Sequence, residues 1–481
     1  MGCGGGVNTT PPNPSGFTNA SLNGTYAFAF TGNNGGGFFT VAGSFTANGA
    51  GAITGGTEDI NSPGTGLIAP AVSITGSYNV RSDGRTVATI NSTSLNPGVS
   101  FGLDLVILNP QKALVMRFDQ NGSASGTIDL QTSSAFSFSS VAGAYAFNVA
   151  GVDGSGNSDG SVGLLNADNA GNITSGTLDN NDNFTVTTNQ PLTPTTYTAP
   201  AAGTGRGTAT ITTSTLGTRN FAYYVVDANH LKLIETDNAG PFLSGDAFRQ
   251  TSTAVSGSFV FTMAGATING HGVFLAGGVL NTDGAGNVQS TSIEDIDNGG
   301  GLTAAGGVSV SGTYAVSGGR GTMQLNNGAT TLNLVFYPSS GGLQMLDVDA
   351  GAIAAGGAAL QQSGAPFSNG SINNGYGLNF TGILGPNSLS PTEIDAISQF
   401  NATGSGSLSG ALDVNSFGAL TSNLALNGSY SVSANGRGTA SLRTSQGTIN
   451  LIFYMAGSSQ VLFVEMDEGF GQLSVGGFAA Q

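Results

Sequence analysis

The stretch Gly24-Thr25-Tyr26-Ala27-Phe28 alternates small and large side chains, and three divergent copies of it follow along the chain. Alternation of this kind is typical of a half-buried β-strand. The copies are Gly143-Ala144-Tyr145-Ala146-Phe147, Gly257-Ser258-Phe259-Val260-Phe261 and the weaker Gly375-Tyr376-Gly377-Leu378. Because the copies recur roughly every 117 residues, the 481-residue chain is predicted to contain four versions of one unit.

Three further markers recur once per unit: a tyrosine in the middle, an arginine shortly after it, and a glutamine at the close. They are Tyr78, Tyr197, Tyr314 and Tyr430; Arg85, Arg206, Arg320 and Arg437; and Gln131, Gln250, Gln361 (with Gln362) and Gln481. Short Ser-, Thr- and Gly-rich linkers separate the units. The predicted organisation is a flexible tether followed by four β repeats. Its bounds are 1–20 for the tether and 21–131, 139–250, 254–362 and 371–481 for the repeats.

Eight short strands are predicted in the first unit, from apolar segments bounded by Asn-Gly and Asp-Gly turns. They cover 26–30, 38–46, a strand ending near 59, 72–80, 86–90, 101–108, 113–118 and 126–130. Eight sequential antiparallel strands can close into a barrel, which removes exposed strand edges. We therefore predict an all-β chain of four tandem antiparallel eight-stranded meander barrels, with β-sandwiches as the alternative.

The Gly-x-aromatic opening Gly24-Thr25-Tyr26, with a second such phrase at Gly76-Ser77-Tyr78, resembles the lipocalin and avidin style of barrel. Those barrels usually carry Trp, and this chain has none. The 27 Phe residues, nearly seven for each unit, are expected to fill the cores instead.

Charge on this chain is sparse and mainly negative. Charged residues make up 8% of it, against about 25% in a typical soluble domain. Lys and Arg total 11 against 27 Asp and Glu, which gives a net charge of −16. Because affinity for phosphate rests on clustered Lys and Arg, neither nucleic acid nor an anionic membrane surface is expected as a partner. No apolar run approaches the ~20 residues of a membrane-spanning helix.

The start Met1-Gly2-Cys3 resembles a bacterial lipoprotein just after its signal peptide. In that family a small residue precedes a Cys that carries the lipid, and a polar tether follows, as 7–14 does here. The resemblance covers about a dozen residues, without the apolar stretch that precedes them in the family. It implies a lipid on Cys3, the single cysteine, and a location at the bacterial cell surface, outer membrane or periplasm. The alternatives are an incidental thiol and N-myristoylation, which favours Ser or Thr where Gly6 stands.

The recurring arginine begins the fifth strand of each unit, near the unit linkers. One interpretation is a clamp for a ligand carboxylate. The favoured interpretation is a structural ion pair, or a cap on carbonyl groups, between neighbouring units, because a ligand-binding arginine should lie at the open end. The residues given this structural role are Arg85, Arg206, Arg320 and Arg437.

Recurring acids are predicted at the opposite end, where the third and seventh strands finish. Those of the third strands are Glu58, Asp59, Asp179, Glu294, Asp295 and Asp413; those of the seventh are Asp119, Glu235, Asp237, Asp347, Asp349, Glu465 and Asp467. One interpretation is an acidic rim that binds a hard cation such as calcium, or a polyol. The favoured interpretation is solvated strand ends, where Asp suits turns.

A separate calcium candidate is the loop from Asp153 to Asp159, which carries oxygen ligands on alternate residues. It lacks the Gly at the sixth place and the distal Glu of an EF-hand, so a polar hairpin is the favoured interpretation. Calcium is the only cofactor that the sequence suggests.

Catalysis is not expected. The two histidines, His230 and His271, occupy non-equivalent places, and neither HExxH nor GxSxG occurs. His230 is interpreted as a solvated loop residue. A pair of carboxylates could still serve a glycosidase, but the absence of Trp and the fourfold repetition of one framework argue against it.

The predicted function is a non-catalytic, lipid-anchored surface protein, with the four modules strung on short linkers as a structural or adhesive stalk. One alternative is a protein that binds a small ligand or calcium at the barrel mouths. Another is a subunit of an extracellular fibre. The partners considered are the lipid anchor, other surface proteins, polysaccharide and copies of the chain itself.

Overall fold

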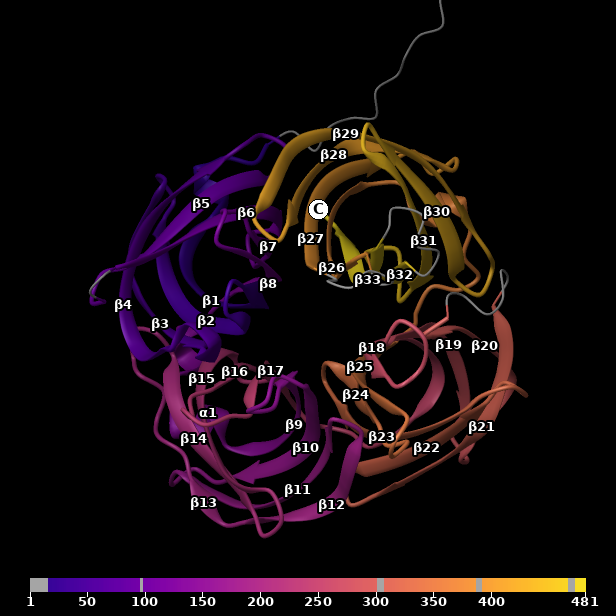
Figure 1. Ribbon diagram of the computed structural model, residues 1–481, viewed down its shortest axis with the longest axis horizontal. Helices are drawn as coiled ribbons and strands as arrows, with labels where there is room; N and C mark the ends of the chain where they lie inside the picture. The colour runs from indigo at the N-terminus through magenta and orange to yellow at the C-terminus, as the bar shows by residue number, and fades with distance from the viewer. Residues whose placement is uncertain (1–15, 96–97, 301–306, 386–391, 466–471) are drawn as a thin grey trace, which may run out of the picture.

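The structure is a computed structural model of residues 1–481, and it describes all of them except 1–15, 96–97, 301–306, 386–391 and 466–471. The strands form four closed antiparallel barrels in chain order (Figure 1). The prediction of four eight-stranded meander barrels is confirmed, and the sandwich alternative is wrong.

The strands of each barrel follow one another in sequence. Barrel 1 contains β1 (Asn23–Asn34), β2 (Gly37–Asn48), β3 (Ala52–Ser62), β4 (Leu67–Val80), β5 (Arg85–Ser92), β6 (Val99–Asn109), β7 (Lys112–Arg117) and β8 (Gly122–Leu130). Barrel 2 contains β9 (Gly143–Val152), β10 (Ser158–Ala167), β11 (Asn172–Asp182), β12 (Thr185–Thr193), β13 (Thr195–Thr196), β14 (Arg206–Thr213), β15 (Gly217–Asp227), β16 (His230–Glu235) and β17 (Phe242–Arg249). Barrel 3 contains β18 (Ser256–Thr267), β19 (Val273–Asp283), β20 (Asn287–Asn298), β21 (Val308–Ser317), β22 (Arg320–Asn326), β23 (Thr331–Ser339), β24 (Gly342–Asp347) and β25 (Ile353–Gln361). Barrel 4 contains β26 (Gly375–Leu384), β27 (Thr392–Ala402), β28 (Ser407–Ser416), β29 (Ala419–Val432), β30 (Arg437–Thr444), β31 (Gly447–Met455), β32 (Gln460–Glu465) and β33 (Gln472–Ala480).

Helical turns are confined to the connections. They are η1 (Asn19–Ser21), η2 (Pro63–Thr65), η3 (Ser133–Ala135), α1 (Phe138–Val141) and η4 (Asn369–Ser371). In barrel 2 the fourth strand position is divided into β12 and β13, and the barrel closes as the others do. No helix among the described residues is long and apolar enough to cross a bilayer.

The first strand of each barrel pairs with both the second and the last, and this pairing closes the barrel. In β1, Tyr26, Phe28 and Phe30 point inward and join the core of barrel 1. Ala27 lies on the outer face of the same strand, against Ala222 of barrel 2. The alternation of large and small residues in the repeated phrase therefore fills one barrel and leaves room for its neighbour to approach.

The four barrels stand around a common axis, so barrel 4 lies beside barrel 1 (Figure 1). Each barrel packs its outer face on the next through an apolar cluster that the two share. The last of these clusters joins Val106, Leu108, Leu114 and Met116 of barrel 1 to Ile397 of barrel 4. The modules were expected to form a linear string, and instead they close into a ring, because the same outer face of every unit is complementary to the opposite face of the next.

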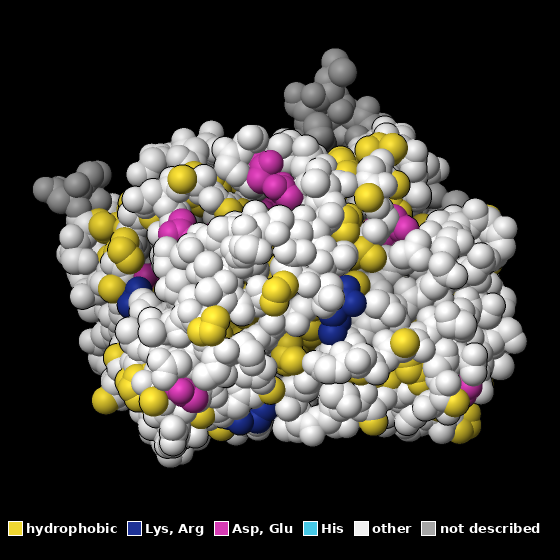
Figure 2. All heavy atoms as spheres, turned by 90° about the horizontal axis from the view of Figure 1, so that it is seen from below, with side chains coloured by type: hydrophobic (Ala, Val, Ile, Leu, Met, Phe, Trp, Pro, Cys, Tyr) yellow, Lys and Arg dark blue, Asp and Glu magenta, His cyan; other side chains and the backbone are white. Residues whose placement is uncertain are grey.

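The ring has two ends, the linker end and the loop end. The linker end carries the chain segments between barrels and the tight turns after β6, β15, β23 and β31; the loop end carries the connections after the first and third strands of each barrel. Charged side chains are few and scattered on the lateral face that Figure 2 displays. The barrel interiors are filled by side chains, and the cavity inside barrel 4 measures about 20 Å³, room for little more than one water molecule.

Candidate functional site

Three of the four junctions between barrels contain the same buried contact, made by an arginine, an aspartate and a tyrosine. At the first junction, Asp59 of barrel 1 accepts hydrogen bonds from Arg206 Nε at 2.8 Å and Nη2 at 2.6 Å. The Tyr224 hydroxyl donates to the same carboxylate at 2.5 Å. Burial raises the pKa of Tyr224 well above its ordinary value, so the phenol keeps its proton and acts as the donor. A bidentate pair of this kind fixes both distance and orientation between the barrels.

The other two copies of this contact differ little in geometry. Arg320 and Tyr337 of barrel 3 bind Asp179 of barrel 2, and Arg437 and Tyr454 of barrel 4 bind Asp295 of barrel 3. The three arginines therefore make ion pairs between neighbouring units, the role favoured from the sequence. The tyrosines escaped the sequence reasoning because they stand in apolar strands that resemble ordinary core. What distinguishes these tyrosines is that each stands opposite the recurring arginine on the neighbouring strand, and only the strand register reveals this.

The junction between barrel 4 and barrel 1 departs from this pattern. Arg85 lies 3.8 Å from Asp413 and donates instead to Asp83 in its own turn at 2.9 Å and to Asn423 at 2.8 Å. Val106 stands opposite Arg85, where the other barrels have tyrosine. This junction is called the seam below.

A second contact repeats at all four junctions and uses a glutamine that closes each unit. In each case the side-chain Nε2 donates to two backbone carbonyls of the next barrel, at 2.6 to 3.1 Å. The bonds run from Gln131 to Thr204 and Val225, from Gln250 to Gly319 and Pro338, from Gln362 to Asn435 and Met455, and from Gln481 to Asp83 and Ile107. The glutamines were recognised as repeat markers, but their role in joining barrels was not predicted.

Replacing Tyr337 with phenylalanine is expected to destabilise the barrel 2–barrel 3 junction by about 1–3 kcal/mol, because Asp179 loses a buried donor. Limited proteolysis of the linker 250–255 measures this loosening directly. Tyr430→Phe is the matched control, since the Tyr430 hydroxyl donates to the Ile372 carbonyl within barrel 4 and contacts neither this junction nor the linker 250–255. Equal linker cleavage in the two variants would contradict the role assigned to Tyr337.

The candidate acidic rim is not exposed. Glu58, Asp59, Asp179 and Asp295 are at most 2% exposed. The strands run further than predicted, β3 to Ser62, so these acids lie within strands. Asp59, Asp179 and Asp295 lie on the outer face of their barrel, where the neighbouring barrel covers them. Glu58 points into the interior of its own barrel, where the Ser92 hydroxyl donates to it. Burial is the main reason that the pKa of Glu58 and of Glu294 rises to about 7.

The remaining candidate metal ligands serve local structure. Asp119, Asp237 and Asp349 each accept the backbone N–H of the strand opposite. Asp153 accepts from Ser155 and Asn157 in its own turn, whereas Asp159 faces the interior of barrel 2 and accepts from Asn180. Asp413 lies at the seam, and Asp467 falls outside the described residues. Within the described part of the chain, no three His, Cys, Asp or Glu residues gather as a metal site would require.

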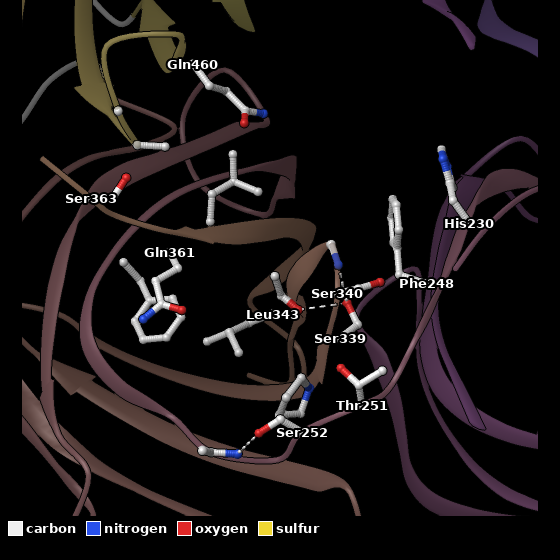
Figure 3. A pocket seen from close by; sticks show the side chains of 18 of the residues that line it. His230, Phe248, Thr251, Ser252, Ser339, Ser340, Leu343, Gln361, Ser363 and Gln460 are labelled. Atoms are coloured by element: carbon white, nitrogen blue, oxygen red, sulfur yellow. Dashed lines mark hydrogen bonds between the residues drawn. The ribbon is translucent and has the colours of Figure 1, made fainter. Parts of the chain in front are cut away.

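A basin of about 700 Å³ opens on the ring axis at the linker end, and residues from all four barrels line it. Most of its lining is polar and uncharged, with serines, Thr251, Gln361 and Gln460 around it (Figure 3). None of the described residues that line it is an aspartate or a glutamate, although the chain holds 27.

Both lysines of the chain lie between barrels 1 and 2, where Lys112 lines this basin and Lys232 is buried nearby. Lys232, 1% exposed, lies 2.8 Å from Asp129 and 3.7 Å from Asp246, and Lys112 lies 3.2 Å from Asp129. Burial opposes ionisation of these acids, yet Lys232 lowers the pKa of Asp246 to about 2 and, with Lys112, holds that of Asp129 well below its usual range. The lysine–aspartate cluster is therefore a third kind of contact between barrels, and it joins barrel 1 to barrel 2.

His230 also lines the basin and is not the solvated loop residue that was predicted. It begins β16, is half-buried, and stacks on Phe248 with ring centroids 4.4 Å apart (Figure 3). Its Nε2 lies 2.6 Å from Asp246. His271, in barrel 3, lies 3.2 Å from Asp297.

Comparison with known proteins assigns no family. No protein-family model matches the sequence, and no curated protein matches it. Among solved structures, transferrin binding protein B from serogroup B Neisseria meningitidis is 10% identical, with coverage of 77% of this chain and 84% of that chain and a TM-score of 0.20. A double mutant of the protein of that name from Haemophilus parasuis Hp5 is 9% identical, with 99% and 98% coverage and a TM-score of 0.20. Similarities this low do not establish relatedness, and nothing about function follows from them.

Proposed function

We propose that this chain is a non-catalytic bacterial surface protein, a rigid ring of four barrels that a lipid on Cys3 holds to the membrane. The observation that supports the proposal is the repetition of one buried Arg–Asp–Tyr contact at three junctions and of one glutamine contact at four. Such contacts fix neighbouring barrels relative to one another, so the closed ring offers a surface of defined shape. Because the ring is compact, we propose a structural or adhesive head in place of the elongated stalk.

The direction of the chain supports a particular orientation for this head. Residue 16 and η1 lie at the linker end, beside the start of β1, so a lipid on Cys3 would place that end toward the membrane. The loop end then faces outward. This end carries Ile268 and Phe417 in its connections and Leu420 at the start of β29, and these side chains are 64%, 39% and 37% exposed. Exposed apolar side chains at this end would contact a partner, either another surface protein or a polysaccharide.

The test is expression of the chain behind a bacterial lipoprotein signal peptide, with an alkyne-bearing fatty acid in the medium. We expect the wild-type protein to be labelled, to sediment with membranes and to be cleaved by protease added to intact cells. Cys3→Ser is the matched control and should be unlabelled and released, with the fold unchanged. A wild-type protein that is unlabelled, or that stays inside the cell, would contradict the proposal.

A second candidate function is the binding of an uncharged, polyhydroxylated ligand in the axial basin. The hydroxyl and amide groups of its lining, and the absence of carboxylates among its described residues, favour such a ligand over a cation. This differs from the binding at barrel mouths that was considered from the sequence. Calorimetry with neutral oligosaccharides should detect binding that Gln361→Ala with Gln460→Ala abolishes; no heat from any of them would exclude it.

A further inference from the structure

The seam differs from the other junctions at two outward-facing positions of β6. Register places Asp104 where the other barrels have Ala222, Val335 and Ile452, and Val106 where they have the junction tyrosines. The outer face of barrel 1 thus brings a carboxyl group, in place of an apolar side chain, to the junction with barrel 4. Asp104 is 7% exposed and interacts electrostatically with Asp413, which is 6% exposed.

The face that barrel 4 brings to the seam is also acidic. Glu393 and Asp395 of β27 stand at positions equivalent to Val273 and Leu275 in barrel 3. The Asn33 side chain of barrel 1 donates to Glu393 at 2.5 Å, and the Ser123 hydroxyl of barrel 1 donates to Asp395. Asp395 is fully buried. Four carboxyl groups therefore lie at this junction, and two of them stand where barrel 3 has Val273 and Leu275.

Few positive groups face these acids. Arg81 and Arg85 of barrel 1 lie near Asp104 and Asp413, and Asp83 adds a further negative charge there. The pair Glu393 and Asp395 is surrounded by hydroxyl and amide groups, namely Ser123, Ser125, Thr381 and Asn33. Asp104, Asp395 and Asp413 are buried and Glu393 is half-buried, so with all four acids ionised the closed seam would hold more negative charge than its two arginines balance.

We propose that the seam is the junction at which the ring opens, and that protonation of its four carboxyl groups holds it closed. When the carboxyls are neutral they can donate as well as accept hydrogen bonds, and the buried acids no longer repel one another. When they lose their protons, the closed ring must bury those charges, whereas an open ring exposes them to water. The three Arg–Asp–Tyr junctions hold through this change because the carboxylate in each of these contacts is paired with an arginine.

The direction of the pH effect follows from proton affinity in the two states. Burial raises the pKa of Asp104 to about 7 and that of Asp395 to about 6, and it raises the pKa of Glu393 well above its usual range. In an open ring these groups would return toward ordinary values near 4. The closed ring therefore binds more protons, so it is favoured at low pH and progressively loses this advantage as the pH rises from about 4 through 7.

The experiment measures the seam and a reference junction in the same chain by spin-label distances, with Cys3→Ser as the background. The seam pair is Gln120→Cys, in the turn after β7, and Leu420→Cys, at the start of β29, close to where Gly418 approaches Gln120. The reference pair is Asn183→Cys and Ala350→Cys, in the turns joined by the Gly351 N–H and the Phe184 carbonyl at the barrel 2–barrel 3 junction. Both pairs are read at pH 5.0 and pH 8.5.

We expect the seam pair to give one short distance at pH 5.0 and a longer population, increased at least several-fold, at pH 8.5. The reference pair should keep its short distance at both. Replacing Asp104 with alanine and Val106 with tyrosine copies Ala222 and Tyr224 of barrel 2, and should keep the seam closed at pH 8.5. An unchanged seam distance in the wild-type background would overturn the proposal, as would an equal change in both pairs or opening that the double variant does not reduce.

Discussion

Asp295→Ala is expected to destabilise the protein by about 3–5 kcal/mol, the range found when one partner of a buried ion pair is removed. Asp295 is 2% exposed and accepts from Arg437 Nε and Nη2, both at 2.8 Å, and from the Tyr454 hydroxyl at 2.6 Å. The substitution leaves a guanidinium and a phenol buried without their acceptor. Urea unfolding followed by circular dichroism measures the loss, as a shift in the first transition.

The matched control is Asp283→Ala in the same barrel. Asp283 is exposed and accepts hydrogen bonds only within its own β19–β20 turn, from Ala285 and Asn287. Its removal should cost far less than the removal of Asp295, because water can replace its hydrogen bonds. Similar losses in the two variants would mean that the junction contact adds little to stability.

Glu235→Gln is expected to stabilise the protein, and the gain in stability is expected to grow as the pH rises. Glu235 is fully buried inside barrel 2, and burial raises its pKa to about 9 even though Arg219 partly opposes this. The unfolded chain has an ordinary pKa near 4.5 at this residue. Between those values the folded protein holds a proton that the unfolded chain has released. Wild-type stability therefore falls with rising pH, by about 1.4 kcal/mol per pH unit for this group.

Glutamine at this position is neutral at every pH, so it removes that dependence. Urea midpoints at pH 5, 7 and 9 should show little difference between wild type and variant at pH 5 and a widening gain for the variant above it. Asp237→Asn is the control, because Asp237 lies outside the barrel in a hydrogen bond with Asn220. Parallel pH profiles for wild type and Glu235→Gln would show that Glu235 is ionised in the folded protein.

The unit and its strands could be predicted because their signals are local and repeated. Alternation in Tyr26-Ala27-Phe28 marks a strand, and its recurrence marks four units. The ring could not be predicted, because each junction joins residues far apart in the chain, as Arg206 and Asp59 are. One sequence by itself gives no indication that those two side chains meet. The short linkers predicted a string of modules.

The candidate acids show where reasoning from local pattern fails. Asp59 and Asp179 follow apolar segments, as solvated strand ends do, and nothing nearby distinguishes a surface acid from one that a second barrel covers. The distinguishing feature lies elsewhere, in a tyrosine opposite the arginine of the next unit. At the seam the same comparison across units finds Val106 instead, and with it the unusual Asp104. Positions that break a repeat are therefore as informative as those that keep it.

The closed ring is the central claim, and small-angle X-ray scattering at pH 5 on the Cys3→Ser chain tests it most directly. Four barrels packed around one axis predict a radius of gyration of about 23 Å, the value for a compact protein of this length. Four barrels strung end to end would give roughly 30 Å or more, with a long tail in the distribution of interatomic distances. The compact value is the one the ring requires, and the extended value would contradict it.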